Sequence, residues 1–515
     1  MRYRCSPAAV MLLLAAGAAA QPVPVGSELQ VNVTIPGPQT SPAAAAGPSG
    51  LHAVAWQGLG TSTDVWLRVW KGDGTLLVPE LRVNSQLSGC QEAPDISFGP
   101  DGSFVVVWQS EGQDGSGWGI FGQRFAANGS LAGPEFQVNA ATSGDQQAPA
   151  VANGPSGFFT VVWESFGQDG DGWGVYARRF NAAGSLGGEV QVASSGTGSQ
   201  RRPDVVAQPT GHVLVAWEGP DGSGPGVFVR RFAADLTAPG SAVQMDSVAA
   251  GFQSSPSLAC DDSGNMIAAW ERGADVVARR FDRFLAPLDG VFTVPPSASG
   301  LRTRPRVGSS GSGDFLVAWE GWSQDGGGPG VFLRAFDFLE MPQTSAVPVN
   351  TFIPGAQHRA DVAVSSQGRV LTAWESEEQD GDGAGVFGQR FAFPGLDFYT
   401  LVPCRVFDTR QSTPLQSGVE RVFAISGNCG VPVTARAVSV NVTVVSATAT
   451  GEVVLYAGDL AVPGTSSSSF RATLARANNA ILGLARNGAG TLSASASLGA
   501  SGTVHLILDV NGYFQ

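Results

Sequence analysis

Residues 104–125 read FVVVWQSEGQDGSGWGIFGQRF, and this stretch decides the fold. It consists of an apolar run that ends in Trp108 and Gln109, an acidic glycine-rich turn, and a second apolar run that ends at Phe125. Neither run has a helical periodicity, and glycine supplies the positive φ that a tight hairpin requires. The stretch therefore predicts two antiparallel β-strands joined by a hairpin.

The same pattern recurs along most of the chain. The tryptophans that end the apolar run, each followed by Gln or Glu, are Trp56, Trp108, Trp163, Trp217, Trp270, Trp319 and Trp374. Their spacing of about fifty residues is the period of a propeller blade. Each repeat also has a strand-like segment after a proline such as Pro94 and a short fourth segment such as FQVN, which ends at Asn139. Four short strands per repeat predict a seven-bladed β-propeller, with the tryptophans in its core and the Gln or Glu as hydrogen-bonding residues at strand ends.

The two ends of the repeat region complement each other. The last repeat stops after its third strand, at Phe391. The missing fourth segment stands near the start of the chain, where residues 29–32 read LQVN. A strand from the N-terminus that completes the last blade would close the ring and remove both sheet edges. We therefore expect a propeller closed by its N-terminal strand.

The N-terminus has the composition of an export signal. Arg2 and Arg4 precede an apolar stretch, residues 8–20, that is too short to span a bilayer and ends in small residues. We expect residues 1–20 to be a cleaved signal peptide and the protein to be secreted or held at the cell surface. No later segment is apolar enough to be a transmembrane segment, and the net charge of −13 argues against nucleic acid as a partner.

A second domain follows the repeats, whose pattern ends at Pro394. We expect the propeller to occupy residues 21–396 and an all-β, β-sandwich-like domain to occupy residues 397–515. Cys404 and Cys429 lie close together in this domain and are the natural disulfide pair. Cys90 and Cys260 lie in non-adjacent repeats, and we expect both to be free.

Both domains resemble known bacterial types. The repeats, over residues 28–392, resemble those of large secreted bacterial repeat proteins through their Trp-Gln/Glu, Gln-Asp-Gly and Gln-Arg-Phe elements. The C-terminal part resembles an all-β accessory domain that is appended to exported bacterial proteins. The matching stretches are PCRVFDTR (403–410), AVSVNVTV (437–444), ANNAI (477–481) and HLILDVNGYF (505–514). This resemblance implies an accessory module for surface attachment, and it carries over no catalytic residues.

Some hairpins between the second and third strands carry an Asp-x-Asp-Gly pattern. The two richest in acid contain Asp169 with Asp171 and Asp380 with Asp382. Carboxylates and exposed carbonyls are calcium ligands, so these loops are candidate calcium sites. Calcium needs six or more oxygens, however, and a hairpin turn alone accounts for the glycines. Both interpretations stay open, and no other cofactor is expected.

Function is expected where the repeats differ, since a residue shared by every blade serves the architecture. The differences gather around the proline that opens the first strand, which lines the central channel in propellers. The charged residues at this channel mouth are Arg202, Arg304, Arg306, His358, Arg359, Asp95, Asp204 and Asp361. A cationic cluster in an acidic protein is a candidate anion site, for example for a carboxylated or phosphorylated sugar. The alternative is a charge network that pairs Arg with Asp across the channel.

Motifs for catalysis are absent from the sequence. The four histidines lack metal-ligand spacing, and neither a Gly-x-Ser-x-Gly elbow nor a phosphate-binding glycine loop occurs. The repeats also lack the Ser-x-Asp-x-Gly-x-Thr-Trp boxes of sialidases. We therefore expect a secreted, non-catalytic protein that binds a glycan, a peptide or a cell-envelope component. The alternatives are a glycan-cleaving enzyme, a glycoside hydrolase or sialidase-like protein with carboxylates and arginines at the channel mouth, and a structural surface component.

Overall fold

The computed structural model describes residues 22–34, 36–59, 62–193, 198–238, 240–246, 251–295, 300–322, 328–337, 345–393, 398–459, 462, 467–485, 489–499 and 502–514. The expected signal peptide, residues 1–20, lies outside the described residues. The chain divides into two compact units, Met1–Phe336 with Pro342–Phe393 and Asp337–Met341 with Pro394–Gln515. No helix among the described residues is long and apolar enough to cross a membrane.

Unit 1 is a β-propeller, and within its described residues the strands form seven antiparallel sheets, here called blades 1 to 7. Blade 1 contains β3 (Gln39–Ala46), β4 (His52–Leu59), β5 (Thr63–Trp70) and β6 (Leu76–Arg82). Blade 2 contains β7 (Gln91–Phe98), β8 (Phe104–Glu111), β9 (Trp118–Phe125) and β10 (Phe136–Gln137). Blade 3 contains β11 (Gln146–Asn153), β12 (Phe159–Phe166), β13 (Trp173–Asn181), β14 (Gly184–Ser185) and β15 (Val190–Gln191).

Blade 4 contains β16 (Arg201–Ala207), β17 (Val213–Pro220), β18 (Pro225–Phe232) and β19 (Val243–Gln244). Blade 5 contains β20 (Gln253–Cys260), β21 (Met266–Arg272), β22 (Asp275–Phe281) and β23 (Phe292–Thr293). Blade 6 contains β24 (Arg302–Ser309), β25 (Phe315–Trp322), β26 (Pro329–Phe336) and β27 (Val347–Pro348). Blade 7 contains β28 (Gln357–Val364), β29 (Arg369–Glu377) and β30 (Ala384–Ala392), together with β1 (Val23–Pro24) and β2 (Leu29–Gln30). Two short 3₁₀ turns, η1 (Pro48–Gly50) and η2 (Pro155–Gly157), join first and second strands.

The repeated aromatic residues form the core between blades. Each of the seven repeat tryptophans lies on a second strand and is at most 3% exposed. Phenylalanines at the start of the second strand and the end of the third also stack, with ring centroids 4.7 Å apart for Phe104 and Phe125 and 5.0 Å apart for Phe315 and Phe336. Burying such large side chains removes much apolar surface from water, so the repeated aromatic residues stabilise the packing between blades.

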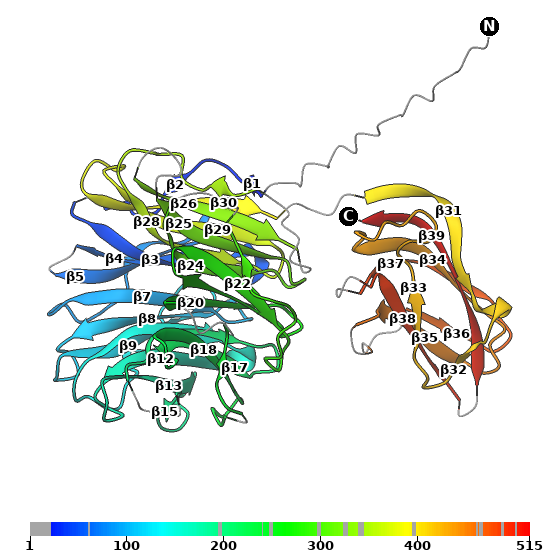
Figure 1. The fold of residues 1–515 in the computed structure, drawn as a ribbon, viewed down its shortest axis with the longest axis horizontal. Helices are drawn as coiled ribbons and strands as arrows, with labels where there is room; N and C mark the ends of the chain where they lie inside the picture. Colours follow the sequence, from blue (N-terminus) through cyan, green and yellow to red (C-terminus); the bar gives the residue numbers. More distant parts are fainter. Residues whose placement is uncertain are drawn as a thin grey trace, which may run out of the picture. The chain divides into compact units, whose positions relative to one another are not determined.

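The N-terminal strand closes the ring, as expected. Leu29 and Gln30 of β2 pair with Gly388 and Phe387 of β30. This register matches that of β10 in blade 2. The Asn32 side chain then accepts a hydrogen bond from the amide of Val386 at 2.8 Å. In Figure 1 the blue β1 and β2 lie beside β30, and β28 contacts β3, so blade 7 adjoins blade 1. The strand β1 also pairs with β30, so the closure extends beyond residues 29–32, the segment predicted to complete this blade.

Unit 2 is a β-sandwich, as expected. One sheet contains β31 (Phe398–Asp408), β32 (Leu415–Gln416), β34 (Ala437–Val445), β37 (Arg476–Gly483) and β39 (Thr503–Phe514). The other contains β33 (Arg421–Ala424), β35 (Gly451–Ala457), β36 (Ser468–Phe470) and β38 (Thr491–Leu498). A short 3₁₀ turn, η3 (Thr409–Gln411), follows β31. Every second residue of β34 is buried in one apolar core with residues of β35 and β38, the alternation that a sandwich strand requires.

Candidate functional site

The first strands of the blades surround a cavity at the channel mouth. Its volume is about 520 Å³, and residues from the first strands of all seven blades line it. The charged residues in its lining are Arg202, Arg304, Arg306, Arg359, Asp95, Asp204 and Asp361. The sequence-predicted cluster is therefore assembled by the fold, with one exception described below.

A β-bulge opens every first strand and determines how these side chains are presented. In each blade, the register between the first and second strands shifts across the proline position. The bulge residue has a φ between 49° and 53°, although none is glycine. The seven bulge residues are Ser41, Ala93, Ala148, Arg202, Ser255, Arg304 and Arg359. Positive φ is uncommon for such residues, so contacts around the bulge must hold it in place.

The Gln or Glu that follows the core tryptophan supplies such a contact. The amide of Ala93 donates to Gln57 of the preceding blade at 2.9 Å, and the amide of Arg304 donates to Glu271 at 2.7 Å. The same bond joins the amide of Arg359 to Glu320 at 2.5 Å. The polar residue of the Trp-Gln/Glu element thus connects each of these blades to the next one by a hydrogen bond. Its expected hydrogen-bonding role is confirmed.

Arginine at the bulge adds a charge that the architecture does not need, since four blades have Ser or Ala there. Arg202 pairs with Glu218 at 2.9 Å, and Arg304 pairs with Glu320 at 3.3 Å. Arg359 pairs with Glu375 at 3.1 Å. These guanidinium side chains are 45–57% exposed, while their carboxylate partners are 2–18% exposed. The carboxylates therefore lie beneath the arginines, and the guanidinium groups form the surface of the cavity.

The three aspartates bridge neighbouring blades. The Asp95 carboxylate accepts from the amide of Val151 at 2.6 Å, and that of Asp204 accepts from the amide of Leu258 at 2.6 Å. Loss of hydration on burial raises the pKa of Asp95 to about 7 and that of Asp204 to about 6. Burial also raises the pKa of Asp361. These groups hold backbone amides and carry less negative charge near neutral pH than exposed aspartates do.

The charge network differs from the alternative that the sequence left open. Arg306 does pair with Asp361, at 3.3 Å, as that alternative expects. The bulge arginines instead pair with Glu of the second strand in their own blade. His358 was expected at the mouth, but its ring bonds Glu375 at 3.1 Å and the cavity lining does not include it. That hydrogen bond raises the pKa of His358.

The carboxylates of the acidic hairpins accept hydrogen bonds from the turn itself and from neighbouring segments of the chain. Asp169 accepts from the amide of Asp171 at 3.1 Å, and Asp171 accepts from the amide of Gly198 at 3.0 Å. In blade 7, Asp380 accepts from Asn32 at 3.2 Å, and Asp382 accepts from Gly37 at 3.2 Å. Among the described residues, no group of three or more His, Cys, Asp or Glu side chains could hold a metal ion. Calcium binding at these loops stays a prediction.

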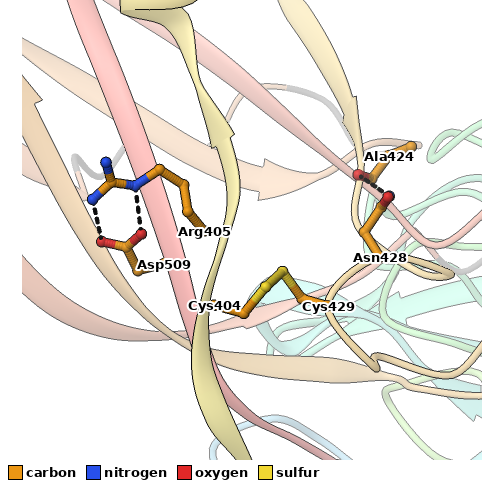
Figure 2. The surroundings of a disulfide bond; sticks show 6 residues. All are labelled: Cys404, Arg405, Ala424, Asn428, Cys429 and Asp509. Atoms are coloured by element: carbon orange, nitrogen blue, oxygen red, sulfur yellow. Dashed lines mark hydrogen bonds and ion pairs between the residues drawn. A yellow bond between two sulfur atoms is a disulfide. The ribbon is translucent and has the colours of Figure 1, made fainter.

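Two of the sequence motifs of unit 2 meet beside its disulfide. Cys404 and Cys429 are bonded, as expected, while Cys90 and Cys260 are free. Next to the disulfide, Arg405 donates two hydrogen bonds to Asp509, at 2.8 and 3.2 Å (Figure 2). The PCRVFDTR and HLILDVNGYF stretches therefore meet on β31 and β39, where their charged residues pair.

One cluster near the channel mouth escaped the sequence analysis. Phe166 and Trp173 face each other across the hairpin of blade 3, and Arg201 of blade 4 lies over the Trp173 ring. A comparison of the third residue after each core tryptophan would have found it, because that residue is Phe166 or Trp322 in two blades and not aromatic elsewhere.

Several solved structures are similar in outline. The polysaccharide lyase Uly1 matches at 10% identity and a TM-score of 0.46, covering 72% of this chain and 100% of that one. A Dyadobacter fermentans DSM 18053 protein of unknown function matches at 10% identity and a TM-score of 0.43, covering 73% and 99%. An α-L-arabinanase of Penicillium chrysogenum matches at 13% identity and a TM-score of 0.39, covering 70% and 98%. No protein-family model matches the sequence, and no curated protein is significantly similar to it. These likenesses identify no function for this chain.

Proposed function

We propose that the protein is exported and binds an acidic glycan at the mouth of its propeller channel without cleaving it. The observation that carries the proposal is the use of the bulge position. Ser or Ala fills it in four blades, whereas Arg202, Arg304 and Arg359 fill it in three and present guanidinium groups to one cavity. Guanidinium groups bind carboxylates and sulfates through paired, charge-assisted hydrogen bonds.

The electrostatics of the cavity favour an anion. The four lining arginines stay charged at any physiological pH. The carboxylates beneath them are largely covered, and the pKa values of Asp95 and Asp204 are raised to about 7 and 6. Each of the four arginines is paired with a carboxylate, and the arginine is the more exposed partner in every pair, so a ligand in the cavity meets the positive partners first.

Export is part of the same proposal. The basic and apolar N-terminal residues support it, and so does the disulfide between Cys404 and Cys429, because disulfides persist in oxidising compartments. A ligand outside the cell, such as an envelope or matrix polysaccharide, is consistent with that location.

The deciding experiment replaces Arg304 and Arg359 together with Gln. Binding of uronic-acid and sulfated oligosaccharides would be measured by isothermal titration calorimetry, with the melting temperature as a check on folding. The proposal expects a nearly unchanged melting temperature and an affinity loss of about 1–3 kcal/mol for each lost charge-assisted contact. A large drop in melting temperature with unchanged affinity would instead identify the arginines as structural.

Glycan cleavage is the second candidate, and one observation favours it. A carboxyl group with a pKa of about 7, as in Asp95, is suited to act as a general acid near neutral pH. The test is the release of reducing ends from the same oligosaccharides. Turnover by the native protein that is lost in Asp95→Asn would replace the binding proposal, and binding without turnover would exclude cleavage of those sugars.

A further inference from the structure

Blade 3 presents an aromatic pair beside the channel mouth. Phe166 ends β12 and Trp173 begins β13, and the two residues are direct cross-strand partners. Their ring centroids are 5.3 Å apart, with the planes inclined by 60°. Phe166 is 50% exposed, so the pair faces water rather than the core. Large aromatic surface left in water at one place is a candidate for ligand contact.

A charged residue of the next blade holds this pair in place. The guanidinium carbon of Arg201 lies 4.7 Å from the centroid of the Trp173 ring, within the range of a cation–π contact. The same side chain bonds Glu164 through Nε at 3.0 Å, and Glu164 is buried. Arg201 is thus fixed at two points, and it joins the aromatic pair of blade 3 to the first strand of blade 4.

The other blades do not repeat this combination. The residues equivalent to Phe166 are Leu59, Glu111, Pro220, Gly273, Trp322 and Glu377. The residues equivalent to Arg201 are Thr40, Glu92, Gln147, Ser254, Thr303 and His358. The cross-strand partner of Trp322 is Pro329, so blade 6 has one exposed aromatic residue without a second. The architecture of a blade therefore does not require the cluster of Phe166, Trp173 and Arg201, which we call the aromatic platform.

The platform and the cavity meet at the start of β16. Arg201 belongs to the platform, and the next residue, Arg202, lines the cavity. Glu164 anchors both residues, since its carboxylate accepts from Arg201 Nε at 3.0 Å and from the amide of Arg202 at 2.6 Å. Phe166, Trp173 and Arg201 are not part of the cavity lining, so a ligand that contacts both places must extend beyond the cavity.

This inference rests on the proposed function and narrows its ligand. We propose that the ligand is an acidic polysaccharide chain, and that the platform binds the apolar face of one sugar ring while an acidic group of a neighbouring unit binds Arg202. A sugar ring has a C–H face that packs against aromatic rings and hydroxyl groups at its edge that accept bonds from guanidinium groups. The acidic group is a carboxylate or a sulfate, which share the same recognition chemistry.

The test compares chain length with two matched variants. Phe166→Ala removes the exposed ring of the platform, and Trp322→Ala removes the equivalent exposed ring of blade 6, which is 47% exposed. Oligogalacturonides of increasing length, sulfated galactan oligosaccharides and uncharged cello-oligosaccharides serve as probes in calorimetry. We expect the native affinity for one acidic series to rise with chain length. Phe166→Ala should lower the affinity for long chains about tenfold, a loss typical of one aromatic contact, and leave the affinity for the shortest chains unchanged. Trp322→Ala should change neither affinity.

Each other outcome overturns a different statement. Suppose that Phe166→Ala and Trp322→Ala change the affinity equally or not at all, while the double variant Arg304→Gln with Arg359→Gln weakens binding of chains of every length. That result would refute the platform and leave the cavity site intact. Loss of binding in Phe166→Ala but not in the double arginine variant would refute the cavity as the anion site. Binding of the uncharged series alone, or of no series, would refute both proposals.

Discussion

The carboxylate of Asp361 accepts a hydrogen bond from the backbone amide of Ala44 at 2.7 Å, across 317 residues of sequence. This bond links the first strand of blade 7 to the first strand of blade 1. Asp95 and Asp204 form equivalent links between blades 2 and 3 and between blades 4 and 5. The same carboxylates line the candidate site, so replacing any of them changes both a link between blades and the lining of the cavity.

The aspartates predict an unusual pH dependence of stability. The folded-state pKa of Asp95, about 7, lies above the usual value of 3.8. The folded state therefore binds this proton more tightly than the unfolded state, and its contribution to stability is fully present below pH 3.8 and is lost as the pH rises toward 7. Asn cannot ionise, so the unfolding free energy of Asp95→Asn relative to that of the native protein should be higher at pH 8 than at pH 5, as measured by urea denaturation. The same difference between variant and native protein at pH 5 and at pH 8 would contradict the raised pKa.

Arg304 and Glu320 should contribute unequally to the stability of the fold. Arg304→Ser installs the residue found at the bulges of blades 1 and 5, so the unfolding free energy should fall by at most about 1 kcal/mol, as for exposed ion pairs. Glu320→Ala leaves the amide of Arg359 without its acceptor and should cost about 1–3 kcal/mol. Chemical denaturation of both variants checks the order. A larger loss for Arg304→Ser would mean that the arginine is needed for the bulge.

Ring closure predicts a large effect of a small deletion. Removing residues 27–32 takes away β2 and the Asn32 side chain and leaves β30 unpaired along much of its edge. The melting temperature should drop, with a loss of several kcal/mol, because two sheet edges become exposed. Asn32→Ala should show a part of this loss, about 1–3 kcal/mol for the amide of Val386. An unchanged melting temperature after the deletion would disprove the role of the strand.

The disulfide should stabilise unit 2 by constraining its unfolded chain. Cys404 and Cys429 are 25 residues apart, and closing a loop of that size is worth about 3–4 kcal/mol in the chain-entropy model. Replacing both with Ala should lower the unfolding free energy of this unit by about that amount. Cys260 serves as a control for a cysteine that is neither bonded nor reactive. Burial raises the pKa of its thiol to about 12, so alkylation of the folded protein should leave it unmodified. Peptide mass spectrometry without reduction detects both the Cys404–Cys429 bond and the unmodified Cys260.

The sequence was sufficient for the architecture because the decisive residues are large and periodic. Tryptophans such as Trp108 and glycines such as Gly115 have few roles at their positions, and residues 29–32 repeat a pattern seen in other blades. The disulfide partner of Cys404 followed from a different signal, because Cys429 is near it in the sequence and residues 397–515 contain no other cysteine.

The details of the site were not accessible in this way. Nothing in the identity of Ser41, Ala93 or Arg304 indicates a positive φ, since the bulge is enforced by hydrogen bonds from the preceding blade. The pairing of Arg304 with Glu320 rather than with an aspartate across the channel depends on the direction in which the bulge turns the side chain. The platform joins Trp173 to Arg201 of another blade, and such contacts appear only when the blades are side by side.

The closing strand also sets an order of events during folding. Asn32 and Val386 lie 354 residues apart, so β2 can pair with β30 only after the rest of the propeller has been synthesised. Hairpins within each blade form from local contacts, whereas this final pairing carries a high contact order and is slow. Until it occurs, β30 offers an open edge whose register fits residues 29–32 of any copy of the chain. Crowded, incompletely folded molecules are therefore prone to exchange this strand and form domain-swapped dimers.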